Sequence, residues 1–222
     1  MGDKQILSSV KDQVLIEKRR KQMIQGAITL FKEKGFHRTT TREIAKESGF
    51  SIGTLYEYIR TKEDILFLVL DSIYHQVRIQ LEAIIDLASP SIENFISVMR
   101  SYFRVMDDLQ EEVLILYQEV KSLKKESRDY VIRKERDMVQ ILERALTTCL
   151  PDAIPKQDAE LLANNIFVQG QMWAFRRWIL QKQFTLEAYT DGQINYLLNS
   201  LNIAREKREE KSVEGGLLYG ES

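Results

Sequence analysis

Hydroxyl and amine side chains gather between Thr39 and Asp64, where their chemistry would suit contact with nucleic acid. Threonine, serine and tyrosine hydroxyls can donate hydrogen bonds to phosphate oxygens and base edges, and a tyrosine ring can pack on a thymine methyl group. A lysine at the start of a helix is placed to meet a phosphate. Counting two neighbours that lie between them, the residues that we expect to contact DNA are Thr40, Thr41, Ser51, Ile52, Gly53, Thr54, Tyr56, Tyr58 and Lys62.

Local signals in the same stretch predict the helices that would carry these side chains. Thr40 and Glu43 form a capping-box pattern, which begins a helix at the residue after Thr40. Gly49 suits the left-handed position just past the end of that helix. Ser51 can cap a second helix over residues 52–59. A helix, a short turn that contains glycine and a second helix together indicate a helix-turn-helix.

The second helix carries more large and polar side chains than one buried face can hold. Tyr56 and Tyr58 cannot both point inward together with Thr54 and Glu57 on so short a helix. Either the tyrosines cover a small core with their hydroxyls in water, or the helix is a recognition helix in the DNA major groove, which we expect. Glu57 would then either accept a hydrogen bond from a cytosine amino group or repel phosphates and sharpen selectivity.

Several short patterns occur together here, and their combination is specific. They are Thr39-Thr40-Thr41, Ile44-Ala45, Gly49, residues 51–56, Tyr58 and residues 62–66. This combination, over about a quarter of the chain, resembles the DNA-binding domain of tetracycline-repressor (TetR) family regulators. Ile59 departs from the family pattern, in which an aromatic residue is more usual at this core position. The resemblance implies a repressor that binds a double-stranded DNA operator as a homodimer.

Charge is divided unevenly along the chain of 222 residues, whose net charge is −1. Residues 1–62 contain 13 Lys and Arg against 7 Asp and Glu, whereas the remainder contains 19 against 26. A basic end beside an acidic remainder is typical of a protein that meets phosphate at one end, although solvated charges could also fluctuate in this way. Within the basic end, residues 18–21 could be a solvated part of a helix, could contact phosphate or could form a minor-groove arm.

Other classes of protein lack their sequence signatures. His37 and His75 belong to no zinc-binding pattern, and neither a glycine-rich phosphate loop nor a nucleophile elbow is present, so we expect no enzyme, no metal and no cofactor. Cys149 is the only cysteine and is expected to pack as a small buried side chain. The sequence has neither an apolar run of membrane-spanning length nor a signal core, which predicts a cytoplasmic protein without a membrane partner.

Apolar periodicity predicts an all-α fold, with an N-terminal three-helix helix-turn-helix domain and a larger C-terminal helical domain. The expected parts are a DNA-binding domain over residues 1–62 with a poorly ordered start over 1–11, a ligand-binding and dimerisation domain over 63–205, and a flexible tail over 206–222. Expected helices span about 12–34, 41–48, 52–59, 62–87, 90–106, 109–123, 126–149, 156–181 and 185–205.

Large apolar side chains in the second domain could line a ligand pocket, although such residues more often form core. The candidates are Phe95, Met99, Phe103, Tyr117, Trp173 and Arg176. An apolar lining beside an arginine predicts a small hydrophobic effector with an anionic end. The segments around Tyr117 and Trp173 are loosely similar to TetR-family members that sense acyl-CoA thioesters, which implies a long-chain acyl-CoA of fatty-acid metabolism as the effector.

The late helices are expected to pair two copies of the chain. The segment 166–180 is apolar on most sides, as in a helix that lies between two proteins. Gly170 would let the helices of two copies approach closely, and Leu197 and Leu201 would complete the interface. We therefore predict a ligand-responsive repressor of a palindromic operator. The alternatives are a ligand-independent, chromosome-organising DNA-binding protein and a repressor that senses many drugs; a helical adaptor that does not bind DNA is disfavoured.

Overall fold

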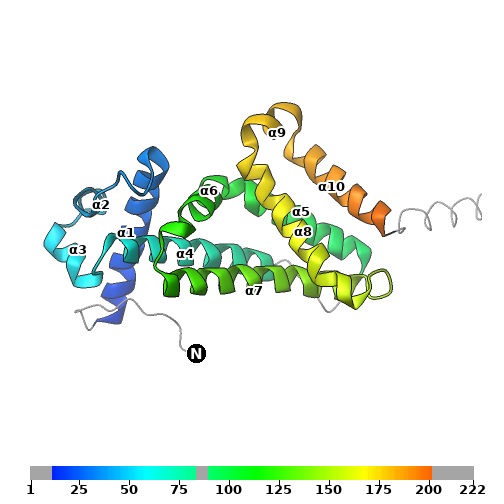
Figure 1. The fold of residues 1–222 in the computed structure, drawn as a ribbon, viewed down its shortest axis with the longest axis horizontal. Coiled ribbons are helices and arrows are strands. Elements are labelled where there is room, and N and C mark those ends of the chain that lie inside the picture. The colour runs from blue at the N-terminus through cyan, green and yellow to red at the C-terminus, as the bar shows by residue number, and fades with distance from the viewer. Residues whose placement is uncertain (1–11, 84–89, 202–222) are drawn as a thin grey trace, which may run out of the picture. The chain divides into compact units, whose positions relative to one another are not determined.

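Helices make up the fold of the part that the computed structural model describes, which is residues 12–83 and 90–201 (Figure 1). These residues form ten α-helices and one short 3-10 helix, with no strand among them, so the predicted all-α class is confirmed. The predictions for residues 1–11 and 206–222 lie outside the described residues. The helices belong to two compact units, whose boundaries differ from the boundary predicted at residue 62.

The first unit combines the described residues up to Gln80 with Leu109–Met138. It contains α1 (Gln13–Lys34), α2 (Thr41–Glu47), α3 (Ile52–Tyr58), most of α4 (Lys62–Glu82), α6 (Gln110–Glu119), the 3-10 helix η1 (Val120–Ser122) and the first part of α7 (Lys125–Cys149). In this unit α1 packs against α2, α3 and α6. The helices around the predicted helix-turn-helix therefore share their unit with helices from much later in the chain.

A shared apolar core holds the first three helices together. Its almost fully buried side chains are Met23, Ala27, Phe31, Ile44, Ala45, Leu55 and Ile59. Gly26 allows α1 and α2 to approach, because a Cβ atom there would lie only 2.7 Å from Ser48 Oγ. Helices of seven residues, such as α2 and α3, are not stable alone in water, so this packing is what maintains them.

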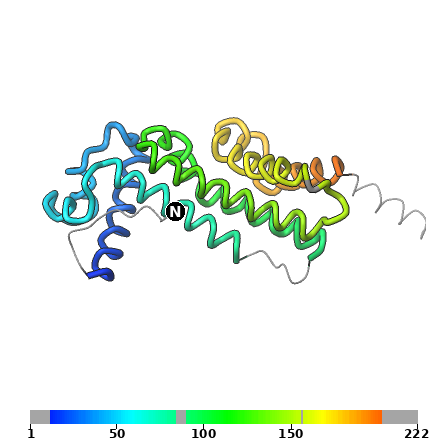
Figure 2. Tube along the Cα trace, turned by 60° about the horizontal axis from the view of Figure 1, so that its bottom comes forward, coloured from blue at the N-terminus to red at the C-terminus, as the bar shows by residue number. Residues whose placement is uncertain are grey.

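Two hydrogen bonds join α4 and α7 within the first unit, where the two helices lie side by side (Figure 2). The Tyr74 hydroxyl of α4 donates to Glu135 Oε2 at 3.3 Å, and the Tyr130 hydroxyl of α7 donates to Asp71 Oδ1 at 2.9 Å. Burial raises the pKa of the Glu135 carboxyl, and the bond from Tyr74 opposes that rise. At its far end α4 stops at Glu82, earlier than predicted, and residues 84–89 lie outside the described part.

The second unit contains the helices that were predicted to bind ligand and to dimerise. These are α5 (Ile92–Asp108), the last part of α7, α8 (Lys156–Phe175), α9 (Arg177–Gln183) and α10 (Leu186–Ser200). α5 packs against both α8 and α10. The Tyr102 hydroxyl of α5 donates to the Phe167 carbonyl oxygen of α8 at 2.7 Å, and the two rings stack with centroids 6.0 Å apart.

The single helix predicted over residues 156–181 is wrong, because the chain breaks at Arg176 into α8 and α9. Arg176 has φ −105° and ψ 20°, which lies outside the helical region. Its N–H donates to the Met172 carbonyl oxygen and so closes α8, while its own carbonyl oxygen accepts from the N–H groups of Ile179 and Leu180 and so opens α9. The segment predicted as one dimer helix is therefore two helices.

Candidate nucleic-acid interface

The start of α2 is fixed by the predicted capping box, which the structure confirms. Thr40 Oγ1 accepts a hydrogen bond from the Glu43 N–H at 3.3 Å, and Glu43 Oε2 accepts from the Thr40 N–H at 2.9 Å. Lys34 at the end of α1 donates to Glu43 Oε1. The bond from Lys34, followed by the two from Thr40, lowers the pKa of the Glu43 carboxyl to about 2. Thr40 is thus exposed and held in place at the entrance to α2.

The turn between α2 and α3 also follows its local signals. Gly49 has φ 79°, in the left-handed region, as predicted. The Phe50 N–H donates to the Ala45 carbonyl oxygen at 3.0 Å, which satisfies a carbonyl at the end of α2. Ser51 Oγ then accepts from the Thr54 N–H at 3.1 Å and caps α3. Between them these contacts set the direction in which α3 leaves α2.

The structure divides the two tyrosines of α3 between core and surface. Leu55, Tyr58 and Ile59 lie at spacing i, i+3 and i+4 and are buried in the core. Tyr58 is only 2% exposed, so the prediction that it contacts DNA is wrong, whereas Tyr56 is 51% exposed. Each of the two competing interpretations therefore holds for one tyrosine.

Tyr56 belongs to an exposed polar surface that α2 and α3 form together. Its hydroxyl lies 3.1 Å from Thr41 Oγ1, at hydrogen-bonding distance, so the first residue of α2 steadies the ring. Ser51 and Gly53 are exposed, and Ile52 and Thr54 are partly exposed. The structure thus brings together all the predicted DNA-binding residues except Tyr58 and Lys62.

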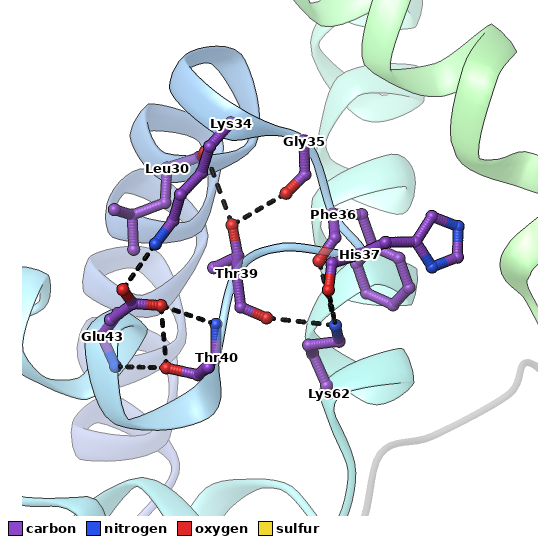
Figure 3. A network of polar contacts seen from close by, with 9 residues as sticks. All are labelled: Leu30, Lys34, Gly35, Phe36, His37, Thr39, Thr40, Glu43 and Lys62. Atoms are coloured by element: carbon purple, nitrogen blue, oxygen red, sulfur yellow. Dashed lines mark hydrogen bonds and ion pairs between the residues drawn. The ribbon is translucent and has the colours of Figure 1, made fainter.

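Lys62 opens α4 but does not reach outward. Its Nζ atom donates to carbonyl oxygens of the loop between α1 and α2, and the network appears in Figure 3. The prediction of a free phosphate-binding lysine at this position is therefore corrected. The sequence carried no signal for this contact, because the carbonyl groups belong to residues more than twenty positions earlier.

Other cations that sequence reasoning did not single out lie exposed around the helix-turn-helix. They are Arg38, Arg42, Lys46 and Arg60. Their charge alone could have identified them, because cations beside a recognition helix can meet phosphate. Residues 18–21 belong to α1, so the predicted possibility of a minor-groove arm is wrong; within them, the Arg19 guanidinium lies 5.4 Å from the Phe50 ring centroid.

The predicted ligand-pocket residues do not form one lining. Phe95, Met99 and Phe103 are completely buried in the second unit, as core side chains. Trp173 is 3% exposed, and its Nε1–H donates to Asp107 Oδ1 at 2.6 Å. Tyr117 belongs to the first unit and is 64% exposed, which corrects its assignment to the pocket.

Arg176 and Gly170 also take places that differ from the predicted ones. Arg176 is exposed at the break between α8 and α9, where its backbone is needed for both helix ends. Gly170 faces its own chain, since a Cβ atom there would lie 2.4 Å from Tyr102 Cε1 of α5. Its lack of a side chain serves the packing of α8 on α5, which corrects the prediction that it serves contact between two copies.

The second unit has a hollow of about 400 Å³ beside the predicted dimer surface. It is lined by Ala153, Pro155, Asp158, Leu161, Leu162, Ser200 and Leu201. None of the predicted pocket residues is among them. Leu201, predicted at the dimer interface, is partly exposed there, as is Leu197 on the same helix.

Metal and membrane signatures were sought in the part of the chain that the structure covers. Within it, no three His, Cys, Asp or Glu side chains gather in a way that could hold a metal ion. Over the same residues no helix combines the length and apolar character that crossing a bilayer requires. Cys149 is a free, buried cysteine, as predicted.

Comparison with known proteins agrees with the geometry of the helix-turn-helix. Residues 23–69 match the family described as bacterial regulatory proteins, tetR family. The transcriptional regulator HbdR of Aromatoleum sp. (strain CIB) is 28% identical over 203 residues, which are 91% of this chain and 89% of HbdR. The fatty acid metabolism regulator protein of Bacillus subtilis is 22% identical and covers 82% of this chain and 94% of its own length.

Solved structures share the fold. A bacterial regulatory protein of the tetR family from Rhodococcus RHA1 superposes with a TM-score of 0.72 at 22% identity, covering 83% of this chain and 97% of its own. AibR, solved in complex with isovaleryl coenzyme A and operator DNA, has a TM-score of 0.66 at 22% identity, covering 80% and 97%. The matched helix-turn-helix, the relatives along most of the chain and the shared fold identify this chain as a member of the TetR family of transcriptional regulators.

Proposed function

We propose that this chain is a transcriptional repressor that binds a palindromic DNA operator as a homodimer and leaves it when a small hydrophobic effector binds. The observation that carries the DNA-binding part is the exposed pair of Thr41 and Tyr56 on α2 and α3, which presents two hydroxyls beside exposed cations. Hydroxyls and cations in that arrangement suit base edges and the flanking phosphates.

Exposed apolar side chains of the second unit support the dimer. On α8, Leu161 and Val168 are 64% and 47% exposed, and on α10 Tyr196 is 71% exposed. Leu161 and Leu201 line the same hollow, so the start of α8 and the end of α10 are neighbours. A second copy that covered this surface would remove apolar area from water, which is the main driving force for association.

Contacts within the first unit give an effector a physical route to the DNA-binding helices. Lys32 Nζ of α1 lies 2.7 Å from Glu112 Oε1 of α6. His37, in the loop before α2, places Nε2 3.2 Å from Ser122 Oγ in η1. A ligand that moves α6 or α4 would therefore move the helices that hold Tyr56, provided that it binds the DNA-incompetent state more tightly.

A coenzyme A thioester is the effector class that we propose. AibR is described as a complex with isovaleryl coenzyme A, and the relative from B. subtilis is named as a regulator of fatty acid metabolism. Within this chain, the apolar helices of the second unit fit the acyl part. The buried state of Phe95, Met99 and Phe103 means that those side chains would have to move to admit it.

The test is genome-wide binding followed by release. Binding at a few palindromic promoter sites supports a regulator, whereas many dispersed sites would favour a chromosome-organising protein. Release of the bound DNA should then be measured against acyl-CoA thioesters, free fatty acids and neutral apolar drugs. We expect release by thioesters; release by neutral drugs alone would contradict that effector class and indicate a multidrug sensor.

A further inference from the structure

Lys62 carries a cation at the start of α4, yet its side chain turns back toward the loop between α1 and α2 (Figure 3). Its Nζ atom lies 2.9 Å from the Phe36 carbonyl oxygen, 3.0 Å from that of Thr39 and 3.4 Å from that of His37. An ammonium group has three donor hydrogens, so these three acceptors use its full capacity. The same atom lies 4.2 Å from the centroid of the Phe36 ring, a cation–π contact.

The loop that receives Lys62 is itself closely tied. The Thr39 side chain is buried, and its Oγ1 atom donates to the Gly35 carbonyl oxygen at 2.9 Å. The Thr39 N–H donates to the Phe36 carbonyl oxygen at 3.1 Å. Buried carbonyl groups need partners, and Lys62 provides them for this loop. The lysine thus joins the entrance of the helix-turn-helix, just before α2, to its exit, just after α3.

The position of Lys62 in its helix strengthens this reading. A positive charge at a helix N-terminus is disfavoured by the helix dipole, because the free N–H groups there are also positive. The carbonyl oxygens of the loop supply the negative ends of three peptide dipoles and offset that effect. A phosphate contact would require Lys62 to leave all three acceptors, and those carbonyl groups would then lose their partner.

We propose that Lys62 is a positioning residue, which fixes α2 and α3 in the orientation that reads DNA and does not itself bind phosphate. This inference rests on the proposed DNA-binding function. A phosphate ligand and a positioning residue have different signatures. Loss of a phosphate contact weakens binding to every sequence and lowers the salt dependence by roughly 0.9 per contact, or about 1.8 for two half-sites. Loss of a positioning residue weakens binding to the preferred sequence and leaves the salt dependence unchanged.

The experiment uses the full-length chain and a duplex that the wild-type chain selects from a randomised library, with an unrelated duplex of equal length beside it. Affinity for both is measured by fluorescence anisotropy across a series of potassium chloride concentrations. For Lys62→Met we expect at least a tenfold loss on the selected duplex, little loss on the unrelated one and an unchanged salt slope. Lys46→Met, which removes an exposed lysine of α2, controls for the loss of one cation near the helix-turn-helix.

Lys62→Arg keeps the charge and provides the second test, which stands even if Lys62→Met folds poorly. A planar guanidinium cannot direct three donors at oxygens grouped around one point, so we expect reduced affinity for the selected duplex. A phosphate ligand would tolerate arginine well. Full affinity in Lys62→Arg, or a shallower salt slope with equal losses on both duplexes in Lys62→Met, would overturn the positioning role alone. Failure of the wild-type chain to select any duplex would overturn the proposed function, and the positioning role with it.

Discussion

Two neighbouring tyrosines of α3 have opposite roles because of where a short helix points them. Tyr56 and Tyr58 are about 200° apart around the helix axis, so they cannot share a face. The apolar partners of Tyr58 hold it in the core, and Tyr56 is left exposed with its hydroxyl beside that of Thr41. A ring steadied in this way loses less freedom on binding DNA than a mobile one.

The first prediction concerns this hydroxyl pair. Tyr56→Phe removes one hydroxyl and Thr41→Val the other, and each should weaken binding to the selected duplex by about 0.5–1.5 kcal/mol, the net value of one hydrogen bond. The double variant should lose less than the sum, because each single change already removes the partner of the other hydroxyl. Anisotropy titrations of the four proteins measure the coupling, and strictly additive losses would show that the two hydroxyls act independently.

At the scale of helices, local signals were readable in the sequence and distant partners were not. The capping box of Thr40 and the left-handed turn at Gly49 depend on residues within five positions, and both are as predicted. The carbonyl acceptors of Lys62 lie 23 to 26 positions earlier. The partner of Gly170 is on another helix, α5. Contacts of that kind depend on how helices pack, which residue spacing does not encode.

The second prediction uses two glycines in helices of the second unit. Gly170→Ala would place Cβ 2.4 Å from Tyr102 Cε1, and the resulting overpacking should destabilise the protein by about 1–3 kcal/mol. Gly192→Ala in α10 is the matched control, because a Cβ there meets nothing within 4 Å. That change should stabilise the protein by up to about 1 kcal/mol through helix propensity. Urea unfolding measures both, and equal effects would contradict the close packing of α8 on α5.

The third prediction concerns the acid between α4 and α7. The pKa of Glu135 is raised in the folded protein, so the folded state holds its proton more tightly than the unfolded state does. The stability that this group contributes is therefore present below its unfolded pKa of about 4.3 and is lost as the pH rises through the folded pKa. Glu135→Gln keeps an acceptor for Tyr74 without the charge. It should gain stability relative to wild type at pH 7 and less at pH 4 in urea unfolding; an equal difference at both pH values would contradict burial as the cause.

At the scale of the whole molecule, DNA binding by this family fold depends on assembly. One chain presents one recognition helix, and a palindromic operator needs two, with half-sites about 34–36 Å apart along the duplex. Gly170 cannot report on that assembly, because any side chain there disturbs the chain's own α5. The informative positions are exposed apolar residues of α8, whose replacement leaves the packing within the unit unchanged.

The last prediction is that Val168→Glu gives a folded monomer. Val168 is 47% exposed on α8, so a carboxylate there stays in water in a single chain but would be buried against the second copy, where an unpaired charge is costly. Ile132→Glu is the control, since Ile132 is 46% exposed on α7, in the first unit and away from the proposed dimer surface. Sedimentation should show a monomer for the first and a dimer for the second, and only the first should lose affinity for the selected duplex. A dimer in both would move the interface away from α8, and a monomeric variant that retains full operator affinity would contradict the need for two recognition helices.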